Sequence, residues 1–178
     1  TYFRTRRNHR LTRQPARRRL RLESLEARWL LSGETTLIGP GANWNYPAEG
    51  TNLDDVSWQD VSFADNLWAS GPAELGYGDG DEATVLDSTP TYPCYYFRHG
   101  FEVTDPAAYE SLTLNIIRDD GAVAYLNGQE VARSNMPAGE ITYDTWSATV
   151  VGGDDPDERT WHEFAVDAGL LVSGPNVV

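Results

Sequence analysis

The sequence lacks lysine, has a single cysteine and contains no long apolar segment, and these shortages exclude several classes of protein. Cys94 has no second cysteine to pair with, so an internal disulfide framework is excluded. The longest apolar runs span four or five residues, far fewer than the roughly 20 that a transmembrane helix requires. The basic N-terminal segment is not followed by the apolar stretch of roughly 7–15 residues found in a standard secretory signal peptide.

The chain is also poor in residues that perform catalysis. Beyond residue 32 the histidines are His99 and His162, and His162-Glu163 does not continue into the H-E-x-x-H pattern of zinc enzymes. Neither a G-x-S-x-G elbow nor a phosphate-binding G-x-x-x-x-G-K-[ST] loop occurs. Asp119 and Asp120 are neighbours in one expected turn, so they cannot flank a glycosidic bond as paired catalytic carboxylates do. The sequence therefore predicts a chain that is not an enzyme.

Charge divides the chain into two unequal parts. Residues 1–32 hold ten arginines and two acids, a net charge of +8, whereas residues 33–178 hold four arginines and twenty-five acids, a net charge of −21. A body this acidic repels nucleic acids and anionic membranes and favours a well-solvated surface. Residues 1–19 show no hydrophobic pattern and are expected to be disordered, and residues 20–33 are expected to include a short amphipathic helix.

The clearest structural signal lies in Leu112–Arg133. Aliphatic side chains alternate there with polar ones, at Leu112, Leu114 and Ile116, which is the period of a strand with one buried face. Residues 118–121 end in glycine and predict a turn. Asn127-Gly128 then predicts a two-residue hairpin loop, because both residue types tolerate positive φ. The expected cross-strand pairs are Leu126–Gln129, Tyr125–Glu130 and Ala124–Val131, and the segment as a whole predicts a β-meander.

Further strands are expected at Tyr95–Val103, Ile141–Val151 and Trp161–Val166, with a loop or single helical turn at Pro106–Tyr109. Phe97, Phe101 and Val103 are predicted to face the core, with His99 on the same face unless Gly100 forms a bulge. Cys94 is expected to be a buried, inert thiol within an extended segment. Strands at this spacing without long helices predict an all-β antiparallel sandwich or barrel. We expect a linker at residues 33–43 and a folded domain at residues 44–178, whose last strand would continue beyond Val178.

Two resemblances sharpen these expectations. Four segments resemble, in their order along the chain, a galactose-binding-like β-jelly-roll domain of large secreted bacterial proteins. They are WQDVSFADNLWASGPAELGYGDGDEAT, YYFRHGFEV, DDGAVAYLNGQEVARSNMPAG and LLVSGPNVV. This resemblance covers residues 44–178 and implies a non-catalytic, carbohydrate-binding-module-like sandwich that often holds a structural calcium. LEARWLLSG resembles the LEPR-XLL segment of exported bacterial proteins, although Ala27 stands where that motif has proline. It implies that residues 1–32 are a sorting segment outside the fold and that the protein is secreted or lies on the cell surface.

Acidic loops are the candidate metal sites. Asp79, Asp81 and Glu82 in GDGDEA supply the oxygen ligands that calcium prefers, but the full D-x-[DN]-x-[DN]-G spacing of a calcium loop is absent. A second acidic cluster occupies residues 154–158. A solvated loop is the default interpretation of each cluster, and calcium bound in one of them is the alternative. Asp119 and Asp120 are interpreted as turn residues, one of them neutralised by Arg118 or Arg133, with contact to a ligand or calcium as the alternative.

Aromatic side chains are the richest resource for binding, because flat rings with polar edges stack on the C–H faces of sugars. Trp58, Trp68 and Trp161 lie on apolar-patterned runs and are predicted to belong to the core. The remaining candidates lie near loops or on an outer face, and the predicted ligand-binding set is Tyr125, Trp146, Tyr77, Asp119, Asp120 and Arg133.

Two functions follow from these patterns. The first is a carbohydrate-binding or adhesive module, whose partner is a glycan or polysaccharide. The second is a structural spacer that packs against neighbouring domains of the same parent chain, including a catalytic hydrolase domain. An aromatic and acidic cleft would favour the first function, and a flat apolar patch would favour the second. Nucleic-acid binding through the arginine-rich segment is disfavoured by the acidity of the body.

Overall fold

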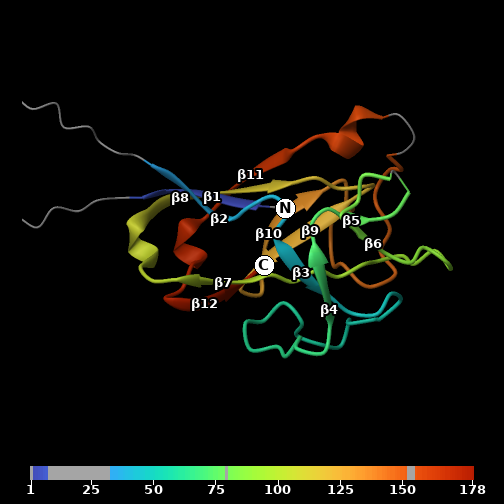
Figure 1. The fold of residues 1–178 in the computed structure, drawn as a ribbon, viewed down its shortest axis with the longest axis horizontal. Coiled ribbons are helices and arrows are strands. Elements are labelled where there is room, and N and C mark those ends of the chain that lie inside the picture. The colour runs from blue at the N-terminus through green and yellow to red at the C-terminus, as the bar shows by residue number, and fades with distance from the viewer. Residues whose placement is uncertain (1, 8–32, 79, 152–154) are drawn as a thin grey trace, which may run out of the picture.

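The computed structural model describes residues 2–7, 33–78, 80–151 and 155–178, and in this part of the chain the fold is all-β (Figure 1). Three short 3₁₀ helices accompany the strands: η1 (Pro106–Ala108), η2 (Pro156–Arg159) and η3 (Ala168–Leu170). The described residues contain no helix that is long and apolar enough to cross a membrane. The strands are β1 (Tyr2–Arg7), β2 (Glu34–Ile38), β3 (Asn43–Tyr46), β4 (Ala69–Pro72), β5 (Leu75–Gly76), β6 (Thr84–Val85), β7 (Gly100–Val103), β8 (Tyr109–Ile116), β9 (Ala122–Leu126), β10 (Gln129–Ser134), β11 (His162–Val166) and β12 (Gly174–Val177).

The largest sheet is antiparallel, with the strand order β11-β8-β1-β2. Its long strand β8 confirms the predicted alternation, because Leu112, Leu114 and Ile116 are all buried. The strand predicted at Trp161–Val166 forms as β11, in which Val166 is buried, His162 and Phe164 are half-buried, and the residues between them are exposed. These two strands therefore present one apolar face to the core.

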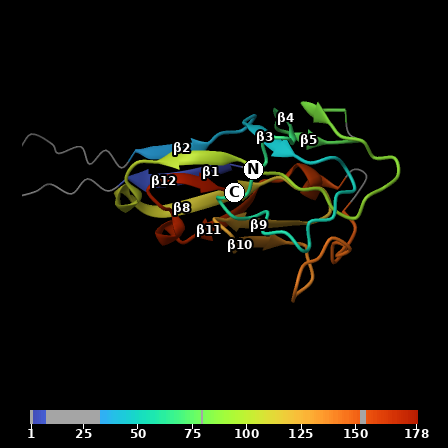
Figure 2. The same ribbon diagram turned by 90° about the horizontal axis from the view of Figure 1, so that it is seen from below.

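Strand β1 lies between β8 and β2, which Figure 2 shows from below. Its register places Thr5 opposite Leu112 on one side and opposite Thr35 on the other. The expectation that residues 1–32 lie outside the fold is therefore wrong for residues 2–7, whose backbone completes the sheet. Residues 8–32, with the predicted helix and the LEARWLLSG motif, lie outside the described residues. The expected linker at residues 33–43 is also wrong, because β2 and the start of β3 occupy it.

Strands β9 and β10 form the predicted hairpin. Asn127 and Gly128 have φ values of 52° and 86°, as a two-residue turn with left-handed conformation at both positions requires. The pairs Leu126–Gln129 and Tyr125–Glu130 are confirmed, but the register then shifts, and Ala124 pairs with Ala132. Val131 lies at this bulge; Ala132 is buried, and Val131 is half-buried and packs against the core.

The predicted meander is wrong beyond the hairpin. Strand β9 pairs with β10 in a two-stranded sheet, whereas β8 pairs with β1 and β11. The polar segment at residues 118–121 therefore carries the chain from one sheet to another. Three further two-stranded sheets join β12 with β7, β3 with β4, and β5 with β6. The described pairings show an all-β arrangement of several small sheets and do not show a closed sandwich.

Two predicted strands are shorter or absent. In Tyr95–Val103 the regular strand begins only at Gly100, and Arg98 forms a single bridge to Asn45. No strand forms in the predicted range Ile141–Val151. The predicted single turn at Pro106–Tyr109 is confirmed as η1, which Asp105 caps by accepting a hydrogen bond from the Ala107 amide.

The core lies beneath the large sheet and receives side chains from most of the small ones. Its buried members include Ile38, Trp44, Val103, Leu112, Leu114, Leu126, Val166 and Leu171. Val103 is buried as predicted, and Phe97 and Phe101 pack against the core while half-buried. His99 is half-buried, with its ring 5.2 Å from that of Trp44 and its Nδ1 2.7 Å from the Asn43 carbonyl oxygen. The predicted core position of Trp161 is wrong, because this residue is 42% exposed, and Trp58 and Trp68 are only half-buried.

Arg98 organises the irregular segment 57–65, which has no strand or helix of its own. The buried guanidinium group forms an ion pair with Asp65, with Nε 3.0 Å from Oδ2. Its Nη1 donates to the carbonyl of Trp58, and its Nη2 donates to the carbonyls of Asp60 and Phe63. A single side chain thus satisfies backbone groups that would otherwise need a neighbouring strand.

Candidate functional site

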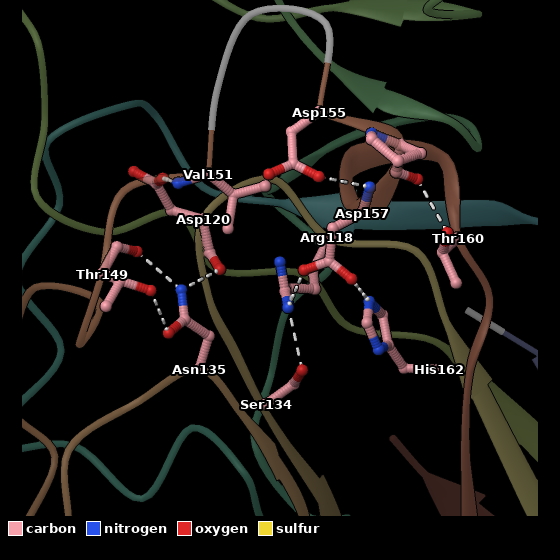
Figure 3. A network of polar contacts seen from close by, with 11 residues as sticks. Arg118, Asp120, Ser134, Asn135, Thr149, Val151, Asp155, Asp157, Thr160 and His162 are labelled. Atoms are coloured by element: carbon pink, nitrogen blue, oxygen red, sulfur yellow. Dashed lines mark hydrogen bonds and ion pairs between the residues drawn. The ribbon is translucent and has the colours of Figure 1, made fainter.

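A polar network lies where β8, β10 and β11 meet the described part of the second acidic cluster, at η2 (Figure 3). At its centre is Arg118, which follows β8 and whose side chain is only 7% exposed. Its Nε donates to Oγ of Ser134 at 3.0 Å, and its Nη2 donates to Oδ2 of Asp157 at 2.6 Å. The third nitrogen, Nη1, is buried and has no hydrogen-bond partner among the described residues. A buried guanidinium without a partner would destabilise the fold. The ion pair between Arg118 and Asp157 avoids this cost and also holds η2 against the end of β8.

The described part of the second acidic cluster is folded rather than a purely solvated loop. Asp155 caps η2 by accepting a hydrogen bond from the Asp157 amide at 3.0 Å. Thr160 closes the other end of η2 by donating to the Pro156 carbonyl at 2.7 Å. The Nε2 atom of His162 lies 3.4 Å from Oδ1 of Asp157, an ion pair only when the imidazole is protonated. The acids here satisfy backbone and side-chain donors, which is a structural role.

Asn135 and Asp120 pin the segment that follows β10. The Asn135 Nδ2 donates to the carbonyls of Asp120 and Thr149 at 2.8 and 2.6 Å, and its Oδ1 accepts from the Thr149 hydroxyl at 2.8 Å. Oδ1 of Asp120 accepts from the Val151 amide at 2.6 Å. A side chain at Gly121 would meet the Asn135 carbonyl oxygen at 2.9 Å. The turn predicted at residues 118–121 is therefore present as a bend at residues 119–120. The Asp120 carboxylate, however, accepts from the distant Val151 amide rather than from an amide of the bend itself.

Trp146 lies on this pinned segment and is 58% exposed. The segment is also held near its start, where the Tyr143 amide donates to Oδ1 of Asp54 at 2.6 Å and the Thr142 amide donates to the Thr145 hydroxyl at 2.9 Å. These bonds explain why Ile141–Val151 is not a strand: its backbone groups find side-chain partners instead of a neighbouring strand. The result is a large, accessible indole on a backbone that is already ordered.

Tyr125 and Arg133 lie together on the outer face of the β9–β10 hairpin. Tyr125 pairs with Glu130 across the strands, and Val123 pairs with Arg133. Arg133 forms a two-pronged ion pair with Glu130, with distances of 2.8 and 2.7 Å. The Trp58 ring packs edge-on against Tyr125 at 5.7 Å. Burial raises the pKa of the Tyr125 hydroxyl, and the nearby Glu130 carboxylate raises it further, so this phenol stays a hydrogen-bond donor at neutral pH.

Tyr77 belongs to a different aromatic group. Its ring lies 5.8 Å from that of Tyr95, which in turn lies 6.0 Å from Tyr92. Burial raises the pKa of Tyr95, whose hydroxyl donates to the carbonyl of Asp87 at 3.0 Å. The structure thus places Tyr77 in one aromatic group and Tyr125 in another.

The proposed calcium ligands are only partly described. Asp79 lies outside the described residues. Oδ2 of Asp81 lies 4.0 Å from Nε of Arg159, and Oε2 of Glu82 accepts from the Gly80 amide at 3.0 Å. Among the described residues there is no group of three or more His, Cys, Asp or Glu side chains placed to hold a metal ion. Calcium at the GDGDEA loop therefore remains a prediction.

Cys94 lines a small cavity between residues 46–51 and 94–97, with a volume of about 10 Å³, which is room for a single water molecule. The thiol is half-buried and not on a strand. Burial raises its pKa to about 11, which a hydrogen bond from Tyr96 opposes only in part. A thiol with this pKa is protonated at neutral pH and is a poor nucleophile.

Sequence reasoning missed the residues that fix these loops, namely Asn135, Asp157, Arg98 and Asn176. Each has a partner at a distance along the chain that no local pattern indicates: Asn135 binds the carbonyls of Asp120 and Thr149, Asp157 pairs with Arg118, Arg98 pairs with Asp65, and Asn176 accepts from the side-chain amide of Asn127. Arg118 pairs with Asp157 and Arg133 with Glu130, partners that the sequence analysis did not assign. Comparison of the chain with protein-family models, with curated proteins and with solved structures finds no match.

Proposed function

We propose that the folded body of this chain is a non-catalytic, glycan-binding or adhesive module of a secreted or cell-surface protein. Its fold would be the galactose-binding-like jelly roll that the sequence motifs resemble, and the parent chain would carry other domains. The proposal needs no reacting group, and it requires a surface on which a sugar ring can stack and hydroxyls can be bound.

The observation that carries the proposal is the exposure of Trp146 on a pinned segment. Trp146 is 58% exposed, although the backbone on both sides of it is ordered: Asn135 donates to the Thr149 carbonyl, and the carboxylates of Asp120 and Asp54 accept from the amides of Val151 and Tyr143. A preordered loop loses little conformational entropy when a ligand binds, so more of the stacking energy appears as affinity. Tyrosine and tryptophan rings also suit sugars because they combine a flat apolar face with a polar edge.

Tyr125 is the second proposed contact, a half-buried ring on the same face of the hairpin as Arg133. One stacked ring and a few exposed hydrogen bonds leave a few kcal/mol after ordering costs, so dissociation constants in the micromolar to millimolar range are expected. Repeated modules in the parent protein would raise the avidity.

A glycan array, screened with calcium and with a chelator, tests the proposal. Any hit is then titrated against Trp146→Ala, Tyr125→Ala and the double variant. Trp161→Ala is the matched control, because it removes an exposed indole that lies immediately before β11 and outside the segment of Trp146. We expect Trp146→Ala to weaken binding at least about tenfold, the loss of one stacked ring, and Trp161→Ala to leave it unchanged. A hit that survives the double variant would contradict this site, and an array without any hit would contradict the function.

A structural spacer is the second candidate function. Val150 lies four residues after Trp146 and is 84% exposed, so the same segment also offers apolar surface to a neighbouring domain. If the array has no hit and a longer native chain shields Trp146 from quenchers of tryptophan fluorescence, the spacer function is favoured.

A further inference from the structure

The charge of the folded body restricts which glycans the proposed site can accept. Residues 33–178 contain twenty-five carboxylates but only four arginines and no lysine, and with the three arginines of β1 the net charge of residues 2–7 and 33–178 is −18, from seven arginines and twenty-five acids. The sign of the electrostatic field around the body is therefore negative, and it attracts cations and repels anions over about one Debye length, roughly 10 Å at moderate salt.

All four arginines of residues 33–178 are described, and each lies in an ion pair. Arg98 pairs with Asp65, Arg118 with Asp157, Arg133 with Glu130 and Arg159 with Asp81. Arg98 and Arg118 are buried as well. Arg159 is the exposed member of this set, with a side chain that is 70% exposed and 4.0 Å from its acid.

Arg133 lies on the same face of the hairpin as the proposed contact Tyr125, and its donors are already in use. Its Nε and Nη2 donate to Glu130, and its Nη1 donates to the carbonyls of Pro137 and Gly139. A carboxylate or sulfate on a glycan would have to displace Glu130 from a two-pronged pair, which is the geometry that arginine prefers. Near Trp146, the exposed charged side chains on the same segment are the acids Glu140 and Asp144.

From this arrangement we propose that the glycan ligand is neutral or carries amino groups, and that uronic acid or sulfated glycans are excluded. The inference rests on the proposed function, since it concerns the ligand of the Trp146 and Tyr125 site. Amine-bearing glycans bind more tightly than neutral ones at low salt, and the difference shrinks as salt screens the carboxylates.

The test combines the array, scored by the formal charge of each glycan, with titration of three β-1,4-linked hexamers of glucose, glucosamine and glucuronic acid. Titrations use the full chain at about 20 mM and about 500 mM NaCl, at a pH where the amines are protonated. We expect the glucosamine hexamer to bind at least about tenfold more tightly than the glucuronic acid hexamer at low salt and within about threefold at high salt.

Two pairs of variants separate a specific site from general attraction to an acidic protein. Glu140→Gln with Asp144→Asn removes two charges beside Trp146, whereas Glu102→Gln with Glu110→Gln removes two exposed charges near η1, at the other end of the molecule (Figure 1). We expect the first pair to reduce the preference for amines more than the second. Trp146→Ala keeps the net charge and should weaken binding of the glucose and glucosamine hexamers at least about tenfold.

Each result of these binding experiments either supports or overturns the inferred charge preference. Equal or tighter binding of the glucuronic acid hexamer, or an array whose hits are anionic, would overturn the inference while leaving the proposed function intact. Amine binding that Trp146→Ala leaves unchanged would also overturn it, because the attraction would then be non-specific. If no hexamer binds, the charge of the array hits decides, with neutral or amine-bearing hits supporting the inference. An array without hits overturns the proposed function and the inference together.

Discussion

The side-chain amides of Asn127 and Asn176 hydrogen-bond to each other, with Nδ2 of Asn127 2.8 Å from Oδ1 of Asn176. Asn127 lies in the hairpin turn between β9 and β10, and Asn176 lies in β12, only 1% exposed. Asn127 also accepts a hydrogen bond from the Val177 amide and donates to the Leu170 carbonyl. The turn residue that sets the hairpin therefore also fixes the hairpin to the C-terminal strand.

Replacing Asn176 with alanine should lower the free energy of unfolding by about 2–4 kcal/mol, because the buried amide satisfies several backbone groups that would lose their partners. Its Nδ2 donates to the carbonyls of Val172 and Gly174, and its Oδ1 accepts from the Val172 amide. Urea denaturation measures the change. Asn52→Ala is the control, because Asn52 makes one exposed bond to the Asp54 amide and should cost less than about 1 kcal/mol.

Replacing Gly128 with valine should destabilise the fold by about 1–3 kcal/mol, because a β-branched residue is strained at positive φ. The new Cβ would also lie 2.9 Å from Oδ1 of Asp60. The matched change is Gly39→Val, where the nearest atom to the new Cβ is Cγ2 of Thr36 at 3.9 Å; it should alter stability by less than about 0.5 kcal/mol. Equal melting temperatures for Gly128→Val and the wild type would argue against the left-handed turn.

Replacing Thr5 with proline tests whether β1 is an integral strand. Because β1 pairs on both sides, proline removes a ladder hydrogen bond and should cost about 3 kcal/mol or more. Thr5→Ser retains the backbone donor and should change stability little. If Thr5→Pro changes the free energy of unfolding by less than about 0.5 kcal/mol, the N-terminal segment behaves as the sequence alone predicted, as an arm outside the fold.

The buried thiol predicts a loss of stability in alkaline solution. Burial raises the pKa of Cys94 from 9.0 to about 11, so the fold favours the protonated form. This contribution is complete below about pH 9 and is lost as the pH rises from there through about 11. Between about pH 8 and pH 10.5 the wild type should therefore lose about 1–2 kcal/mol more than Cys94→Ala. Parallel losses in both proteins, measured by urea denaturation, would place the cause in the tyrosines instead.

Local sequence patterns predicted the parts of the fold that local interactions determine. The alternation of Leu112, Leu114 and Ile116 gave β8, and Asn127-Gly128 gave the hairpin, because period and turn chemistry act within a few residues. The bulge at Val131 escaped this reasoning, since the shift of register there depends on which side chain the core accepts. Strand β1 escaped it as well, because its arginine-rich composition indicates a solvated arm and its pairing partners lie far away in the sequence.

The candidate site was predictable only as a set of residue types. Trp146 was selected as a loop aromatic, but the bonds that hold its segment come from Asp54, Asp120 and Asn135. The bond with the largest sequence separation joins the Tyr143 amide to Asp54, 89 residues apart. A hydrogen bond between an acid and an amide so far apart has no period or spacing to reveal it, and the same backbone amides would have served equally well in a strand.

The hydrogen bonds and the ion pair of Arg98 with residues 57–65 determine which positions of that segment can be substituted during evolution. Three of the four partners of Arg98 are main-chain carbonyls, from Trp58, Asp60 and Phe63, and the fourth is the Asp65 side chain. Because every residue has a backbone carbonyl, most side chains along this segment can be replaced without loss of the hydrogen bonds to Arg98. The segment can therefore accept new surface chemistry while one arginine and one aspartate keep its course across the protein.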